Sequence, residues 1–170
     1  MKYFAYGSNM LSKRLRGRIG SANNPSPYAL RNYRLHFHKR SCDGSAKCNI
    51  VETNLESDVV HGVLFDVGTS DVPILDKCEG AGAGYQRKLL TSDTFAYIAD
   101  SRYIDESFYP YTWYIDLVVA GAEEHSLPET YVAWLKTIRS VPDPEPNRKA
   151  RIEAISILDG RCNQADSNLF

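Results

Sequence analysis

Hydrophobic and polar residues alternate in the stretch YRLHFH, residues 33–38, as expected for a half-buried strand. Its Tyr, Leu and Phe side chains face one way, and Arg34, His36 and His38 face the other. Gly62 interrupts a second apolar run and indicates a bulge or the close approach of another segment. Short apolar runs predict further strands at residues 3–6, 48–53, 59–67, 85–92, 94–99 and 113–122.

Helical spacing of apolar residues is less common along the chain. Asn9 is placed to cap a helix over residues 10–17, and Ser70 or Asp71 to cap a helix that ends at Glu79. The longest helical pattern covers residues 127–141, and a last helix is predicted at residues 147–158. Turns and loops are predicted at residues 21–27, 42–47, 80–84 and 142–146.

Strands therefore outnumber helices, and the two do not alternate regularly. This pattern favours an α+β fold, with a mixed or antiparallel sheet closed into a small barrel and flanked by a few helices. The length of 170 residues suits a single domain over residues 1–170. Residues 159–170 are expected to form a flexible tail.

Charge and composition exclude several classes of partner. The chain has 20 basic and 21 acidic residues, a balance that predicts no binding to nucleic acid or to an anionic membrane. No apolar run is long enough to cross a membrane, and the N-terminus does not resemble a signal peptide. The four cysteines form no C-x-x-C pair and match no zinc pattern, which favours free thiols in the cytoplasm.

Two segments stand out as candidate chemistry. In YGSN, residues 6–9, a strand ends at residues that either cap a helix or offer backbone amides to an anion. Glu79 ends a predicted helix, where the helix dipole disfavours a carboxylate. It is either an ordinary surface glutamate or a general base held in a partly apolar pocket, and this window alone leaves both interpretations open.

Other features are weaker. The glycines in EGAGAGY, residues 79–85, match neither a dinucleotide fingerprint nor a phosphate-binding loop, but they would let a ligand approach the glutamate closely. His36 and His38 share a strand face, yet no third ligand is spaced to join them, so no metal site is predicted. The tyrosines among residues 109–114 are either core residues or the wall of a pocket.

Three segments in order carry a resemblance to a known family. They are YFAYGSN at the N-terminus, LDKCEGAGAGYQRK about 70 residues later, and WYIDLVVAGAEEHSLPETYVAWL after that. Together they resemble the γ-glutamylcyclotransferase family over roughly residues 3–140. In that family an F-x-Y-G-S-N segment opens the chain and a glutamate precedes a glycine ahead of a strand. Met10 departs from the leucine that is common at its position.

The resemblance implies a small mixed barrel and a reaction without a cofactor, in which a γ-glutamyl compound becomes 5-oxoproline and a free amine. It implies that Glu79 is the acid/base and that Tyr114 contacts the substrate. The binding loop would be Tyr6, Gly7, Ser8 and Asn9. The substrate's own α-amine is the nucleophile, which explains why no Ser–His or Cys–His arrangement is found.

The leaving group stays open at this level. A dipeptide, glutathione, a γ-glutamyl amine, an isopeptide or a protected biosynthetic intermediate would each suit the family's reaction. A non-catalytic metabolite-binding module of the same fold is the main alternative function. The expected partner is a small γ-glutamyl molecule, and some relatives form dimers, which favours a homodimer by resemblance alone.

Overall fold

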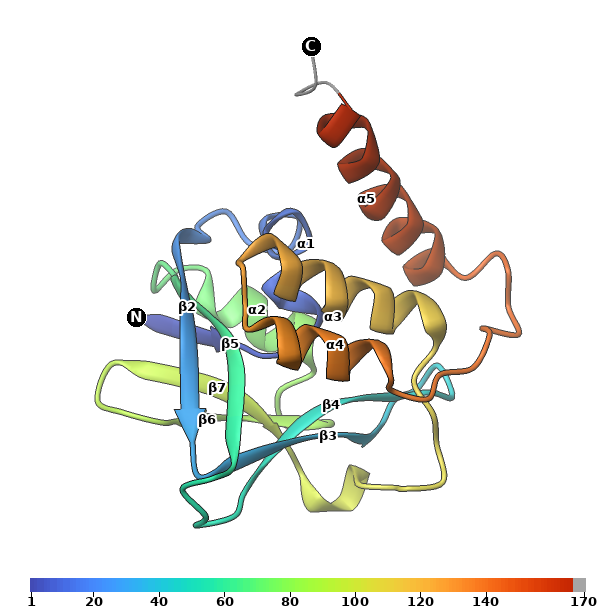
Figure 1. The fold of residues 1–170 in the computed structure, drawn as a ribbon. Coiled ribbons are helices and arrows are strands. Elements are labelled where there is room, and N and C mark those ends of the chain that lie inside the picture. Colours follow the sequence, from blue (N-terminus) through green and yellow to red (C-terminus); the bar gives the residue numbers. More distant parts are fainter. Residues whose placement is uncertain (167–170) are drawn as a thin grey trace.

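Two β-sheets form the centre of the computed structural model, which describes residues 1–166 and the side chains of residues 1–160. The larger sheet has five strands, in the spatial order β2 (Asn23–Arg31), β5 (Val59–Asp66), β1 (Lys2–Ala5), β7 (Thr94–Ala99) and β6 (Tyr85–Leu89). A hairpin of β3 (Tyr33–Arg40) and β4 (Ala46–Glu52) makes the second sheet. The helices lie mostly to one side of the sheets (Figure 1), so the α+β class is confirmed.

The sheets do not close into the predicted barrel. β2 and β6 are free edges of the larger sheet, and the β3–β4 hairpin packs against β5 and β7 without joining their hydrogen-bond ladder. Asn32, with φ of 65°, turns the chain between β2 and β3 and sends the hairpin away from the sheet. Only β1 and β7 are parallel, while the other pairs are antiparallel, as a mixed sheet requires.

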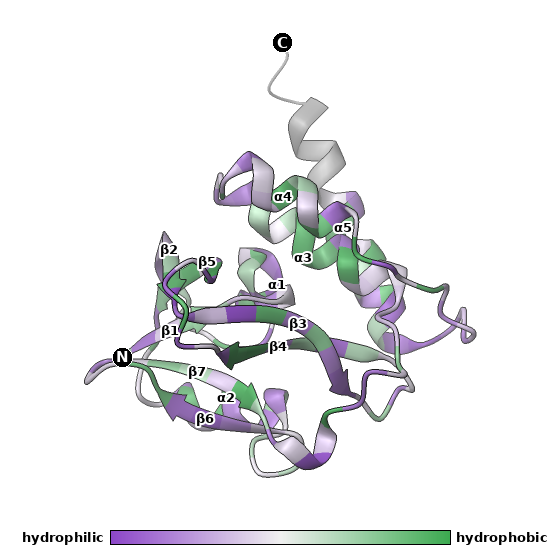
Figure 2. Ribbon diagram, turned by 60° about the horizontal axis from the view of Figure 1, so that its bottom comes forward, coloured by the Kyte–Doolittle hydropathy of each residue, from purple (hydrophilic) through white to green (hydrophobic). Residues whose placement is uncertain are grey.

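The predicted strand at residues 113–122 is instead the helix α3 (Thr112–Glu124). Most of its residues are buried, and the middle of its ribbon is hydrophobic in Figure 2. Residues 113–122 include only one charged residue, Asp116, so the run shows no clear period by which to tell a buried helix from a buried strand. Gly121 lets α3 pack closely, since a Cβ there would lie 2.6 Å from the backbone nitrogen of Leu11.

Three further segments differ from the predictions. Residues 23–27 of the predicted loop at 21–27 lie in the strand β2, which tolerates Pro25 and Pro27 because it is an edge strand. The helix predicted over residues 127–141 is shorter and spans Glu129–Lys136 as α4. The last helix, α5 (Lys149–Asp166), extends beyond its predicted end and points away from the sheets in Figure 1. Residues 167–170 of the predicted tail lie outside the described residues.

The segments around the candidate residues form as predicted, with adjusted ends. After β1 the chain enters a 3-10 turn, η1 (Ser8–Met10), and the short helix α1 (Ser12–Arg16). α2 (Val72–Glu79) ends because Gly80 adopts a left-handed conformation with φ of 64°. Gly62 is a point of close approach, because a Cβ there would lie 2.4 Å from the carbonyl oxygen of Ala5. A second 3-10 turn, η2 (Ser101–Tyr103), follows β7. Within residues 1–166, none of the helices has the length and apolar character needed to cross a membrane.

Candidate active site

A small cavity of about 30 Å³ lies where β1 ends, and we call it the floor of the site. This is room for roughly one water molecule, so the floor can hold only the reacting end of a substrate. The structure brings all six predicted site residues together here, although Glu79 is 70 positions from Asn9 in the chain. The floor is lined by Tyr3, Tyr6, Gly7, Ser8, Asn9, Cys48, Glu79, Tyr85, Tyr97 and Tyr114.

Glu79 is held by two donors from the N-terminal segment. Its Oε1 accepts a hydrogen bond of 2.9 Å from Nδ2 of Asn9 and an ion-pair contact of 2.5 Å from the Arg18 guanidinium. Among the described residues no hydrogen bond reaches Oε2, which leaves that oxygen for a ligand. The side chain is 16 % exposed, so Glu79 is a partly buried carboxylate and not the ordinary surface residue that was the alternative.

Asn9 connects both sides of this contact and is not the helix cap that was predicted. Its Oδ1 accepts a hydrogen bond of 2.9 Å from Arg18, and its Nδ2 also donates to the hydroxyl of Tyr3 at 3.0 Å. With both ends of the amide engaged, the side chain has no bond to spare for helix amides, and α1 begins without a side-chain cap. Asn9 therefore orients Glu79 rather than starting a helix.

Arg18 keeps its charge in this setting. Burial by itself lowers the pKa of the guanidinium, but the Glu79 carboxylate together with other nearby groups outweighs burial and leaves the pKa of Arg18 raised. The guanidinium therefore stays positively charged beside the Glu79 carboxyl group.

Gly7 and Tyr114 meet on the opposite wall. A Cβ on Gly7 would lie 3.2 Å from the Tyr114 hydroxyl and 3.2 Å from Cβ of Cys48, so only glycine leaves this space open. The Tyr114 hydroxyl, at the start of α3, accepts a hydrogen bond of 3.1 Å from the backbone nitrogen of Cys48. The hydroxyl of Tyr85 donates to the carbonyl oxygen of the same cysteine at 2.6 Å. β4, β6 and α3 are thus tied together around the loop.

The floor is lined by tyrosine hydroxyls that stay protonated. Burial is the main cause that raises the pKa of each one, so none ionises near neutral pH. Burial likewise raises the pKa of the Cys48 thiol to about 12. The hydroxyls of Tyr6, Tyr85 and Tyr97 donate to backbone or side-chain acceptors, such as Asp76 for Tyr97 at 2.7 Å. Those of Tyr3 and Tyr114 accept hydrogen bonds from the Asn9 amide and the Cys48 backbone nitrogen. The tyrosines concerned are Tyr3, Tyr6, Tyr85, Tyr97 and Tyr114.

A larger cavity of about 590 Å³ adjoins the floor, and we call it the mouth of the site. Ser8, Glu79, Tyr85 and Tyr114 line both, so the floor opens directly into the mouth. The mouth carries six basic side chains against two acidic ones, although the whole chain has a net charge of −1. The basic residues are Arg14, Arg18, Lys39, Arg40, Lys47 and Lys77, and the acidic ones are Asp43 and Glu79.

Known proteins resemble this chain in sequence and in fold. The model of the AIG2-like family matches residues 59–135. A γ-glutamylcyclotransferase from Bos taurus is 31% identical over an alignment of 159 residues that covers 85% of this chain and 79% of that protein. The chain belongs to the γ-glutamylcyclotransferase family. The Mus musculus γ-glutamylcyclotransferase is 30% identical over 154 residues, with the same coverage.

A solved structure extends the family likeness to the fold. A γ-glutamyl cyclotransferase structure superposes with a TM-score of 0.74 at 25% identity and covers 91% of this chain and 97% of that one. The arrangement of two open sheets with flanking helices is thus the γ-glutamylcyclotransferase fold.

Sequence reasoning overlooked several residues of this γ-glutamylcyclotransferase site. Arg18 lies in the turn after α1, where nothing in the local pattern marks it. Arg14 was not singled out in the sequence, but it is buried, and its side chain donates to the Ser8 hydroxyl at 3.2 Å. Lys39 follows an alternating strand, but a bulge near His38 interrupts the alternation and buries two consecutive residues. Tyr85 and Tyr97 were marked by no local pattern, and only the count of 11 tyrosines in 170 residues hinted at further tyrosines near a site.

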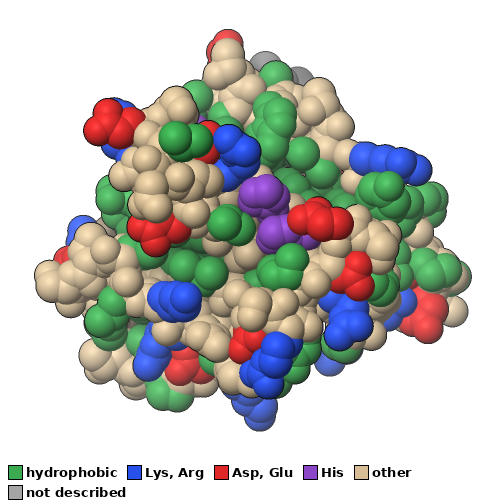
Figure 3. Space-filling model, turned by 90° about the horizontal axis from the view of Figure 1, so that it is seen from below, with side chains coloured by type: hydrophobic (Ala, Val, Ile, Leu, Met, Phe, Trp, Pro, Cys, Tyr) green, Lys and Arg blue, Asp and Glu red, His purple; other side chains and the backbone are tan. Residues whose placement is uncertain are grey.

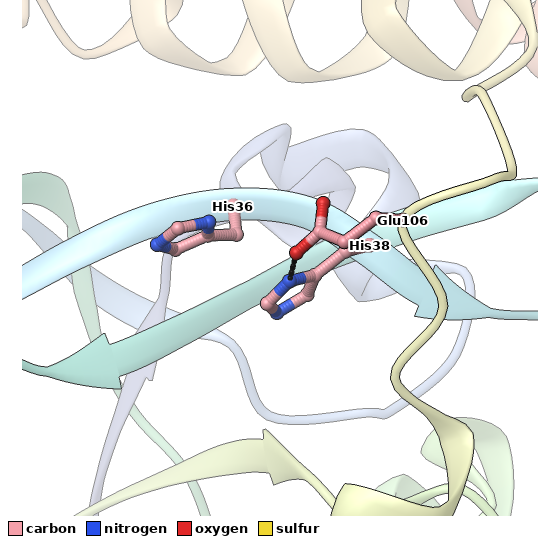
Figure 4. Close-up of side chains that lie close together, drawn as sticks. All are labelled: His36, His38 and Glu106. Carbon is pink, nitrogen blue, oxygen red and sulfur yellow. Dashed lines mark hydrogen bonds and ion pairs between the residues drawn. The ribbon is translucent and has the colours of Figure 1, made fainter.

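The paired histidines have a third neighbour that the sequence spacing did not predict. On the face shown in Figure 3 two histidines lie beside an acidic side chain, and Figure 4 identifies His36, His38 and Glu106. Their potential ligand atoms lie within 4.8 Å of one another, and His38 is buried rather than partly exposed. This arrangement raises the question of a metal site outside the floor and mouth.

The hydrogen bonds of Asn49 argue against a metal there. Its Oδ1 accepts from the backbone nitrogen of Ala99 at 2.8 Å, so its Nδ2 must be the atom that faces Nε2 of His38 at 3.0 Å. Nε2 is then an acceptor, and the ring proton lies on Nδ1, which donates to Glu106 at 2.7 Å. A metal on Nδ1 would force that proton toward the Asn49 amide. The cluster is a hydrogen-bond chain that ties β3 to the loop after η2.

Proposed function

We propose that this chain is a γ-glutamylcyclotransferase that converts a small γ-glutamyl compound into 5-oxoproline and a free amine. The observation that carries the proposal is the position of Glu79, which lines the floor. Its Oε1 is fixed by Asn9 and Arg18, and its Oε2 receives no hydrogen bond from the described residues. Family membership supports the reaction type, because curated relatives bear this name.

In this mechanism Glu79 relays a proton from the substrate's α-amine to the leaving nitrogen. The carboxylate takes a proton from the α-ammonium group of the substrate, and the freed amine attacks the γ-carbonyl carbon to form a five-membered ring. Glu79 then gives that proton to the leaving nitrogen, and the carbon–nitrogen bond breaks. The ring nitrogen loses a second proton, which passes to the released amine, so 5-oxoproline departs with a neutral lactam nitrogen and the amine departs as an ammonium ion. General acid–base assistance of this kind contributes about 10²–10⁴-fold to a rate.

The other floor residues bind and orient in this proposal. The loop Tyr6–Asn9 offers backbone amides to the substrate's α-carboxylate or to the oxyanion that forms during attack. Tyr114 contacts the substrate from the wall opposite, with a hydroxyl already positioned by Cys48. Because the floor has room for little more than the reacting atoms, it favours the folded glutamyl chain over an extended one.

The test is to incubate the purified protein with γ-glutamyl-alanine and to measure 5-oxoproline and free alanine together. The proposal expects the two products in equal amounts. Release of glutamate in place of 5-oxoproline would indicate hydrolysis and contradict the proposal. Thermal stabilisation by γ-glutamyl compounds without any turnover would indicate the binding module instead.

The location and the assembly are proposals of the same kind. Cys42, Cys48 and Cys78 are free thiols in the structure, which supports a reducing compartment such as the cytoplasm. A homodimer is proposed from family resemblance, and size-exclusion chromatography with light scattering tests it.

A further inference from the structure

The basic side chains of the mouth are not balanced by the protein. Arg18 pairs with Glu79 at 2.5 Å, and Lys47 pairs with Asp43 at 2.8 Å, which accounts for both acidic residues of the mouth. Arg14, Lys39, Arg40 and Lys77 have no carboxylate within ion-pair distance in the part of the chain that the structure describes. Four positive charges therefore remain for a ligand.

Two of these cations are buried, which is costly without an anion. Arg14 is 6% exposed and Lys39 is 9% exposed, and Nη1 of Arg14 is a buried donor without a hydrogen-bond partner. A buried charge normally has a partner, because removal from water costs several kcal/mol or more. Burial lowers the pKa of Arg14 to about 10 and also lowers the pKa of Lys39. An anionic ligand in the mouth would supply the missing partner.

The surroundings of Lys39 show that its position is specific. Its Nζ lies 4.9 Å from the centre of the Tyr85 ring, and Tyr85 lines both the floor and the mouth. A Cβ on Gly84 would lie 3.0 Å from that nitrogen, so the glycine-rich segment after Glu79 leaves space for the lysine amine. The glycines therefore make room for a protein cation beside the leaving-group path.

The charge of the glutamyl half does not account for this excess. A γ-glutamyl group carries one α-carboxylate and one α-ammonium, and an ordinary amino acid as leaving group adds a single carboxylate. The four unpaired cations of the mouth outnumber the two carboxylates that such a γ-glutamyl amino acid carries. We propose, building on the cyclotransferase function proposed above, that the preferred leaving group carries two carboxylates, as in a γ-glutamyl-linked acidic amino acid.

Two substrates of nearly equal shape test this inference. γ-Glutamyl-glutamate and γ-glutamyl-glutamine differ only by a carboxylate in place of an amide, so the ratio of their kcat/KM values isolates the second charge. We expect the acidic substrate to be favoured roughly tenfold at low ionic strength, as for a charge-assisted contact. The ratio should fall as salt is added, because the mouth is open to solvent.

Substitutions then assign the effect to the mouth. Lys39→Gln should bring the ratio close to one, and Lys39→Arg should restore most of it. Lys77→Gln removes an exposed cation that the core does not need, so it tests the same point should the buried variant fold poorly. Lys88→Gln is the matched control, since Lys88 is exposed and lies outside the mouth, and it should leave the ratio unchanged.

The outcomes separate this inference from the proposed function. Equal kcat/KM values for the two substrates, or a ratio that neither Lys39→Gln nor Lys77→Gln alters, would overturn the dicarboxylate preference while 5-oxoproline production still supported the cyclotransferase. Absence of 5-oxoproline from γ-glutamyl-alanine and from both test compounds would overturn the cyclotransferase itself, and this inference with it.

Discussion

The floor and the mouth of the site share four residues but differ in almost every physical property. The floor is small, lined by protonated tyrosines, and cross-linked by hydrogen bonds between distant elements. The mouth is about 590 Å³ and basic, and four of its cations have no carboxylate partner among the described residues. In the function we propose, the reaction takes place on the floor and the leaving group is recognised in the mouth, with Glu79 lining both regions.

The largest decrease in kcat is expected from a substitution of Glu79, the residue at the boundary of the floor and the mouth. Glu79→Gln keeps the size of the side chain but cannot carry the proton, so we expect kcat to fall by about 10²–10⁴-fold with γ-glutamyl-alanine. Circular dichroism and the melting temperature show whether the fold is intact. Glu56→Gln, at an exposed loop position, is the control. Turnover near that of the unchanged protein would rule out Glu79 as the acid/base.

The next largest decrease in kcat is expected from a substitution that only narrows the floor of the site. Gly7→Ala places a methyl group 3.2 Å from the Tyr114 hydroxyl and from Cβ of Cys48, which displaces the wall from its working position. A shift of this size in a reacting site lowers kcat by up to about 100-fold. Gly17→Ala is the matched control, because its new Cβ would meet its neighbours no closer than 3.4 Å. Equal kinetics for both variants would show that the floor is more adaptable than the structure indicates.

Loss of the cation behind Glu79 should have a smaller effect on catalysis and a measurable effect on stability. Arg18→Met leaves a partly buried carboxylate without its ion pair, so the free energy of unfolding should fall by about 1–3 kcal/mol. We expect kcat to fall about tenfold, since Asn9 still holds Oε1. Urea denaturation and steady-state kinetics measure the two effects. A variant with unchanged stability would mean that the pair contributes nothing in solution.

The smallest expected effect is a difference in reactivity among the cysteine thiols of the unchanged protein. Cys42 and Cys78 are exposed in the mouth, whereas burial raises the pKa of Cys48 on the floor to about 12. A raised pKa means less reactive thiolate at pH 8, so iodoacetamide should label the two mouth cysteines well before Cys48. Peptide mass spectrometry over time gives the order. Early labelling of Cys48 would show that the floor opens readily to solvent.

Much of this site was predictable from the sequence because its key residues lie at clear breaks in the hydrophobic pattern. YGSN follows a short apolar run, and Glu79 precedes a run of glycines, so both positions were visible as candidates. What the pattern could not supply was their distance from each other. The predicted order of segments became a single site only when α2 and η1 were seen to meet through Asn9 and Glu79.

The missed parts have physical causes. The apolar run at residues 113–122 includes a single charged residue, Asp116, so the run alone shows no clear period. The exposed stripe of Thr112, Asp116 and Glu123 is apparent only in the folded helix α3. Arg18 and Lys39 are polar residues made inward-facing by a turn and by a bulge, which a periodic pattern treats as exposed. A barrel closes only if its edge strands pair with each other. The hydrophobic patterns of β3 and β4 do not show that these two strands pair only with each other.

The close packing at Gly121 is expected to make the two elements that carry Asn9 and Tyr114 move together. Because α3 lies against the backbone of Leu11 without a side chain between them, η1 and α3 cannot separate without breaking one shared contact surface. Asn9 and Tyr114 are carried by these two elements. Amide hydrogen exchange should therefore protect both segments to a similar degree, as one cooperative unit, and the site should open as a whole rather than one wall at a time.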